Sequence, residues 1–96
     1  MTTIGVLHIR FRLPAETLKE KRSIVKSVLE RIRSRYNAAA AEVDDLDTPS
    51  LATLAIVCVS NRDGHADSQL QAIANAVAGW RLDAEILDLE TELVHA

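Results

Sequence analysis

The segment Thr17–Asn37, TLKEKRSIVKSVLERIRSRYN, decides the fold because it has the pattern of a long amphipathic helix. Thr17 and Glu20 have the spacing of a capping box, in which the two side chains satisfy backbone donors at the helix start. Asn37 suits the left-handed position that follows many helices. The apolar side chains recur at helical spacing and form one stripe: Leu18, Ile24, Val25, Val28, Leu29, Ile32 and Tyr36. The sequence therefore predicts a helix here with one buried face.

Strands are expected on both sides of this helix. Apolar and polar residues alternate from Thr3 to Leu13, which is typical of a half-buried strand, and Pro14 ends the alternation. The stretch Leu51–Ser60, LATLAIVCVS, is apolar enough for a central strand, and residues 46–50, LDTPS, predict the turn before it. Residues 38–44, AAAAEVD, are ambiguous because alanine favours a helix, and we assign them to a strand from their neighbours.

A second helix and a last strand complete the chain. Asn61–Gly64, NRDG, predicts a turn, and Ser68 with Gln71 repeats the capping-box spacing, so we expect a helix to open there and end near Gly79. The last strand is expected from about Ala84 to Val94. Its alternation places Leu87, Leu89 and Leu93 on the buried face, and Ile86, Asp88, Glu90 and Glu92 on the other.

The element order βαββαβ predicts an α+β, ferredoxin-like sandwich, with a four-stranded antiparallel sheet and both helices on one face. The first and last strands are antiparallel neighbours in this topology. We therefore expect Arg10 and Arg12 beside Asp88, Glu90 and Glu92 on the open face of the sheet. Exposed cross-strand pairs of this kind contribute only about 0.2–1 kcal/mol each.

Length and composition indicate one domain over residues 1–96, of which 48% are hydrophobic. The single cysteine, Cys58, lies in an apolar strand and is expected to be a buried, unreactive thiol. The N-terminus lacks the pattern of a secretory signal, and no apolar run approaches the roughly 18–20 residues that span a bilayer. A cytoplasmic location is the expectation.

The charges of the chain are divided between its two parts. Residues 1–36 hold nine Lys and Arg against three acids, a net of +6, and residues 37–96 hold two against 11, a net of −9, which together give the formal −3. A total this acidic argues against a general polyanion binder. Charges act locally within about 8–10 Å, however, so a basic patch can still bind an anion.

Five cations of the first helix are the candidate nucleic-acid-binding residues: Lys19, Lys21, Arg22, Lys26 and Arg33. Three of them lie in the first turns, where the helix dipole favours acids by about 0.3–1 kcal/mol each, so their presence needs another explanation. Lys21 falls within the apolar stripe, and either its stem lies along the core edge or its ammonium meets a carboxylate such as Glu42. The plainer alternative is a solvated face that pairs with acids of the same molecule.

Two functions of different class fit this charge pattern. Contact with RNA or with a ribosomal partner through the first helix would engage phosphates more than bases, because few aromatic side chains are present for stacking. The alternative is a protein-interaction module, which forms a homodimer or docks a charged protein, with Ile4, Val6 and Ile86 as an apolar patch on the open face.

Catalysis is not indicated. His8, His65 and His95 are scattered without metal-ligand spacing to Cys58, and neither a glycine-rich phosphate loop nor a nucleophile elbow is present, so no metal or cofactor is predicted. The sequence Asp63-Gly64-His65 could place an acid beside an imidazole, but a turn before a helix explains it as well.

Several short motifs resemble those of one family. They are FRLP (11–14), LKEKRS (18–23), RSRYN (33–37), AEVD (41–44) and VSN (59–61). In this order and spacing they resemble the YlxP-like family of small uncharacterised bacterial proteins (DUF503). The resemblance implies a ferredoxin-like fold, no assigned activity, and a link to translation through neighbouring genes. The chain departs from the family pattern at Ala38 and Ala40, which are usually larger, and at Pro49 and Leu51, where the family carries a Trp with a nearby Arg.

Overall fold

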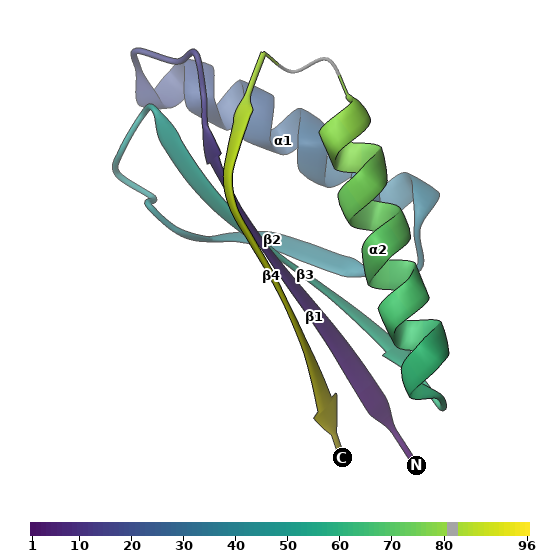
Figure 1. Cartoon of the computed structure of the whole chain (residues 1–96). Helices are drawn as coiled ribbons and strands as arrows, with labels where there is room; N and C mark the ends of the chain where they lie inside the picture. Colours follow the sequence, from purple (N-terminus) through teal and green to yellow (C-terminus); the bar gives the residue numbers. More distant parts are fainter. Residues whose placement is uncertain (81–82) are drawn as a thin grey trace.

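The computed structural model describes residues 1–80 and 83–96 and confirms the ferredoxin-like order βαββαβ (Figure 1). The elements are β1 (Thr3–Arg12), α1 (Leu18–Arg35), β2 (Ala39–Asp44), β3 (Leu51–Ser60), α2 (Asp63–Gly79) and β4 (Glu85–His95). The strands form one antiparallel sheet in the order β2-β3-β1-β4. Both helices cover the same face, and the two chain ends lie close together at one end of the sheet (Figure 1).

The first helix begins as the sequence predicts and ends differently. The Thr17 hydroxyl accepts a hydrogen bond from the Glu20 amide at 3.2 Å, which confirms this capping box. At the other end, Tyr36 is the cap residue, with an extended backbone (φ −128°), and its N–H donates to the Ile32 carbonyl at 3.0 Å. Among the described residues, positive φ occurs at Asp45 and Asp83, so the left-handed cap expected at Asn37 is wrong.

The second helix begins five residues earlier than expected. It starts at Asp63 after the N-cap residue Arg62, which makes no side-chain capping hydrogen bond. Ser68 therefore lies inside α2, and the second capping box is wrong, because the same spacing also occurs within helices. Gly64 belongs to the first turn of α2 and not to a loop. The shift places the carboxylate of Asp63 where the dipole of a helix start favours it.

The last strand contains a β-bulge that reverses part of its expected orientation. Arg10 pairs with Asp88, while the next residue, Phe11, pairs with Ile86, so Leu87 is the additional residue. Paired residues share a face of the sheet, and Ile86 therefore packs with the core beside Phe11. The expectation that Ile86 faces outward was wrong, because an alternating pattern cannot reveal an inserted residue.

The core lies between the helix-covered face of the sheet and the two helices. It contains the inward residues of the two central strands, including Leu7, Ile9 and Ile56, and the apolar stripes of both helices. Gly5 is needed in β1 because a Cβ atom there would lie 2.9 Å from the Cys58 sulfur. Burial raises the pKa of the Cys58 thiol, in agreement with an inert core residue.

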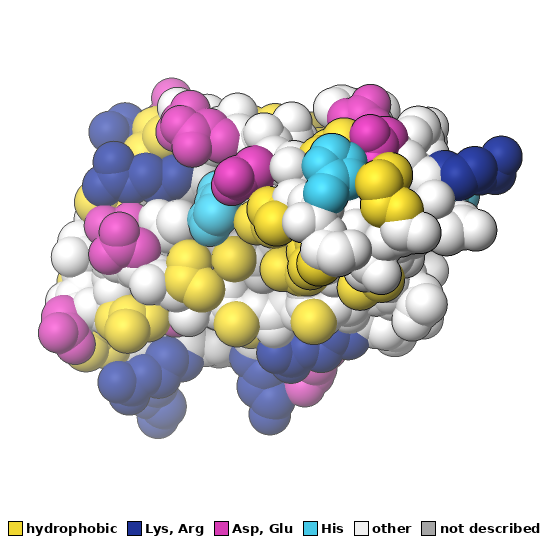
Figure 2. Space-filling model, turned by 90° about the horizontal axis from the view of Figure 1, so that it is seen from below, with side chains coloured by type: hydrophobic (Ala, Val, Ile, Leu, Met, Phe, Trp, Pro, Cys, Tyr) yellow, Lys and Arg dark blue, Asp and Glu magenta, His cyan; other side chains and the backbone are white. Residues whose placement is uncertain are grey.

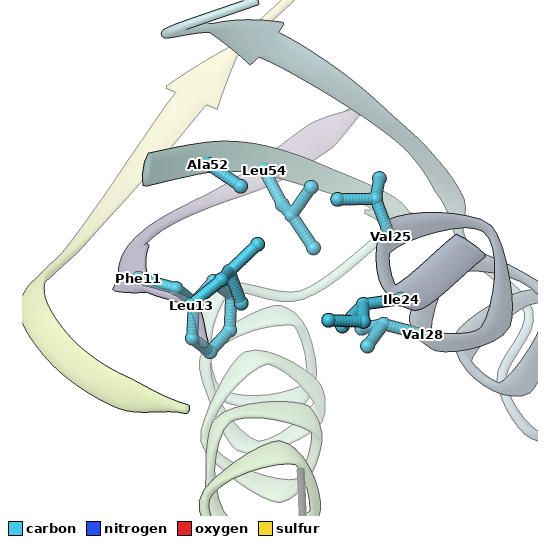
Figure 3. Close-up of a pocket in the computed structure, with 7 residues that line it drawn as sticks. All are labelled: Phe11, Leu13, Ile24, Val25, Val28, Ala52 and Leu54. Carbon is cyan, nitrogen blue, oxygen red and sulfur yellow. The ribbon is translucent and has the colours of Figure 1, made fainter. Parts of the chain in front are cut away.

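A small apolar cavity remains between α1 and the ends of the central strands (Figure 3). The volume of the cavity, measured as the space open to the centre of a water molecule, is about 10 Å³. Seven apolar side chains line it: Phe11, Leu13, Ile24, Val25, Val28, Ala52 and Leu54. A space this small, without polar partners, holds no ordered water and is a packing defect of the core.

Candidate nucleic-acid interface on the first helix

Lys21 lies inside the molecule and not on the surface of α1. Its side chain is 1% exposed, and its ammonium group lies 2.8 Å from Oε2 of Glu42 on β2. The same group donates hydrogen bonds to the carbonyl oxygens of Asp45 and Thr48, the second at 2.9 Å. Within the described chain, no donor is aligned for a hydrogen bond with the buried Glu42 oxygen, so this contact is an ion pair. Of the two alternatives for Lys21, the contact of its ammonium with a carboxylate such as Glu42 is confirmed, and the buried Lys21 does not reach an external phosphate.

Asp45 connects this buried ammonium to the open face of the sheet. Its backbone is left-handed (φ 60°), which directs its carbonyl toward Lys21. Its carboxylate accepts from the Thr53 hydroxyl at 2.6 Å and from the Arg10 guanidinium at 3.1 and 3.3 Å. The Thr53 hydroxyl and the Arg10 guanidinium together lower the pKa of Asp45, and the same contact raises the pKa of Arg10. Residues 45–48 are thus held to α1 and to the sheet.

Arg31 and Arg35 pack on Trp80, the residue that follows the end of α2. The Arg31 guanidinium carbon lies 4.4 Å from the centre of the Trp80 ring, and that of Arg35 lies 5.9 Å from it. Contacts of this kind contribute about 0.5–1 kcal/mol at exposed sites. This flank of α1 therefore has a role in packing the C-terminal ends of the two helices against each other.

The remaining cations of α1 form what we call the basic flank: Lys19, Arg22, Lys26 and Arg33, all exposed. Lys26 lies 4.0 Å from Glu30 in an exposed pair one turn apart, which contributes little. Arg33 donates from Nη2 to the carbonyl oxygen of Ala40 on the outer strand β2, and so places the flank along the β2 edge. Among the described residues, Lys19 and Arg22 make no salt bridge within 4.0 Å.

Acidic side chains gather at the opposite edge of the sheet. Asp88, Glu90 and Glu92 lie on β4, whose neighbour in the sheet is β1. Figure 2 shows apolar side chains across the middle of the view, with Asp and Glu mainly above and to the left of them. Two groups of Lys and Arg lie below them, and further Lys and Arg lie at the upper left and at the right edge. The expected partners of two arginines are only partly correct. Arg10 is paired in register with Asp88 but bonds Asp45, and Arg12 bonds Glu85 at 3.3 Å.

The acid of the Asp63-Gly64-His65 sequence pairs with a different histidine from the one beside it. Asp63 Oδ1 lies 2.8 Å from Nε2 of His95 and accepts from the Thr3 hydroxyl at 2.7 Å, and these contacts lower the pKa of Asp63. His65 instead contacts the Ser60 hydroxyl at 2.9 Å. The pairing ties the end of β4 to the start of α2. Within residues 1–80 and 83–96, no group of three or more potential ligands is arranged to hold a metal ion.

Two residues of this region were missed by the sequence reasoning. Asp45 and Trp80 receive their partners from segments distant in the chain, and neither carries a local motif. The excess of arginine on both flanks of the helix was the available signal for Trp80. No described helix has both the length and the apolar composition of a membrane span.

Known proteins share both the sequence pattern and the fold. "Uncharacterized protein YlxP" of Bacillus subtilis is 30% identical over 59 residues, which cover 62% of this chain and 64% of that protein. The chain thus matches somewhat less than two thirds of this relative's length. A hydantoinase/carbamoylase family amidase from Burkholderia ambifaria has the same fold over 28% of its length, with a TM-score of 0.57 and 13% identity. The designed protein Foldit4 matches over 98% of its chain, with a TM-score of 0.52 and 14% identity.

These structural similarities, at such low identity, concern the fold alone. The sequence comparison is more specific, because residues 4–91 match the family described as "Protein of unknown function (DUF503)". The chain belongs to the DUF503 family.

Proposed function

We propose that this protein binds structured RNA through the basic flank, without catalysing a reaction, in a role linked to translation. The observation that carries the proposal is the division of the α1 cations. Lys21 is used in the core and two arginines pack on Trp80, while the basic flank stays exposed along one edge. Of these exposed cations, Lys19 and Arg22 occupy a helix start that disfavours them electrostatically.

The flank fits the backbone of a nucleic acid better than its bases. Lys19, Arg22, Lys26 and Arg33 extend over about four turns, or roughly 21 Å of helix. Successive phosphates of a folded RNA can be contacted over such a length. Trp80 and Tyr36 are half-buried and pack against the core, so they offer no open stacking platform. Binding of this kind recognises shape and charge more than sequence.

The salt dependence of binding tests the proposal quantitatively. If all four cations of the basic flank neutralise phosphates, the slope of log K against log salt is about −3.6 on a duplex. Fluorescence anisotropy with a labelled, structured fragment of ribosomal RNA measures this slope. The double variant Lys19→Glu/Arg22→Glu should reduce its magnitude by about 1.8.

A matched control separates the basic flank from the total charge. The double variant Arg12→Glu/Arg62→Glu changes the net charge by the same amount at exposed positions away from the flank. We expect it to keep the slope of the wild-type protein. Equal losses in the two double variants would show nonspecific attraction and refute the proposal. Recovery of a protein partner by pull-down that persists after nuclease treatment would refute it in favour of a protein ligand.

A further inference from the structure

The open face of the sheet carries an exposed apolar patch. We define the patch as Ile4, Val6, Val57, Val59 and Val94, which lie side by side on neighbouring strands. Val59 is 64% exposed and Val94 39%. Ile86 does not belong to it, because the bulge in β4 directs that side chain into the core. Contiguous apolar surface of this kind, bordered by polar groups, marks an interaction site in a soluble domain.

We propose that a second copy of this chain packs on the open face, with the two-fold axis parallel to the strands and between β1 and β3. The charges of the two edges favour this occupant. The acidic strand β4 forms one edge of the sheet, and the basic flank lies beyond the other edge, where Arg33 bonds Ala40 of β2. A single chain therefore carries both members of a complementary pair, as a symmetric interface requires.

The direction of the axis follows from the geometry of the sheet. Rotation about an axis parallel to the strands places the partner's β4 above β2. It does not change the position of a residue along the strand direction, so residues at the same height of the two sheets face each other. The apolar patch then meets the partner's patch. Each acidic β4 lies above β2, at the same edge of the assembly as a basic flank, which belongs to the helix layer behind the sheet. Rotation about an axis across the strands would lay the acidic edges on each other. It would also place the patch over the polar end of the sheet, where His8, Arg10 and Asp88 lie.

The size of the face predicts a weak dimer. Four strands about 4.8 Å apart and ten residues long, at about 3.3 Å per residue, give a face of at most roughly 600 Å² before side-chain relief is counted. A standard interface buries about 800 Å² per partner. Asp44 on β2 also opposes the partner's acidic edge, whereas Asp45 is already paired with Arg10. Association should therefore appear at micromolar or higher concentration.

Sedimentation velocity from about 1 µM to about 1 mM tests the association, a range that covers weak protein complexes. We expect a reversible shift from monomer to dimer. Val59→Asp should raise the dissociation constant by at least about tenfold, because it places a charge within the patch. Leu46→Asp is the matched control, since Leu46 is 55% exposed on the loop before β3, and it should leave the constant unchanged. A monomer throughout the range, or equal effects of the two variants, would overturn the proposal.

Cross-linking with a short bismaleimide tests the axis separately. Val6 and Val57 are paired in register on either side of the proposed axis, so Val6 of one copy faces Val57 of the other. A mixture of a tagged Val6→Cys chain and an untagged Val57→Cys chain should cross-link more than either variant alone. Cross-linking in the mixture that does not exceed that of either variant alone would refute this geometry. Cys58 is 2% exposed and serves as the unreactive background in the wild-type protein.

Discussion

Replacement of Lys21 by methionine should destabilise the fold far more than any other change to the cations of α1. The substitution keeps an unbranched apolar stem and removes the ammonium group that contacts Glu42, Asp45 and Thr48. Glu42 then keeps a charge in a site where its side chain is only 16% exposed. Three carbonyl oxygens of the loop, those of Asp45, Leu46 and Thr48, also lose their donor.

The magnitude follows from the environment of each partner. Removal of one member of a buried ion pair costs about 3–5 kcal/mol, because the other charge is left without compensation. The carbonyl oxygens of Asp45 and Thr48 face this buried ammonium, but they belong to a surface loop. A small outward movement of the loop would bring them to water, so they add little. Glu42 can also recover some hydration through its exposed part, and we therefore expect a loss of about 2–3 kcal/mol. That is a large share of the roughly 5–15 kcal/mol that stabilises a domain.

Urea denaturation followed by circular dichroism measures this loss as a midpoint about 1–2 M lower, with an unchanged slope. The double variant Lys21→Met/Glu42→Gln should recover part of the stability, with a coupling of about 1–2 kcal/mol, because no uncompensated charge remains. Lys19→Met, on the same helix but exposed, should change stability by less than about 0.5 kcal/mol. A Lys21→Met protein as stable as the Lys19→Met protein would refute the view that this ion pair holds the loop to α1.

Three further predictions concern the loop, the core and the cavity. Because the pKa of Asp45 is lowered in the folded protein, its carboxylate stabilises the fold above the ordinary pKa of about 3.9. This contribution is lost as the pH falls through the lower folded pKa. Urea midpoints measured against pH should therefore fall less steeply in acid for Asp45→Asn than for the wild type. Gly5→Ala should cost about 1–3 kcal/mol in the same assay, because the new methyl group meets the Cys58 sulfur, and the added substitution Cys58→Ala should recover part of that loss. Ala52→Val, which directs two methyl groups toward the cavity of Figure 3, should raise the thermal midpoint by a few degrees if α1 accommodates them, whereas a lower midpoint would show that the cavity is too small to fill.

The order of elements could be predicted from the sequence because local signals and hydrophobic period agreed. In α1, the Thr17 cap and the apolar stripe point to the same start, and the structure has it there. In α2, the spacing of Ser68 and Gln71 was misleading, because the helix starts at Asp63 without a capping side chain. The carboxylate of Asp63 is instead engaged by Thr3 and His95, contacts that depend on the tertiary fold.

At the candidate site, local sequence patterns predicted some contacts and missed others. The helical angle of Lys21 correctly indicated an inward position, because that angle depends only on helix geometry. Its partner Glu42 could also be named, because it lies on the next strand of the chain. The involvement of Asp45 could not be predicted, since a left-handed aspartate between two strands has no sequence signature and its partner Arg10 is 35 residues away. The bulge at Leu87 is similar, because an alternating pattern reads equally well with or without one extra residue.

The two proposals use different surfaces and bear on each other through symmetry. In the dimer with its axis parallel to the strands, the patch is buried. The two basic flanks lie along opposite edges of the assembly and belong to the helix layers, which face away from the interface, so their outer sides stay exposed. A single folded RNA that reaches both flanks would contact twice as many phosphates as a monomer does. Linkage of two weak sites in this way raises the overall affinity by much more than a factor of two, without any new contact. The apolar patch would then explain how a chain of net charge −3 with only one basic edge could hold a polyanion.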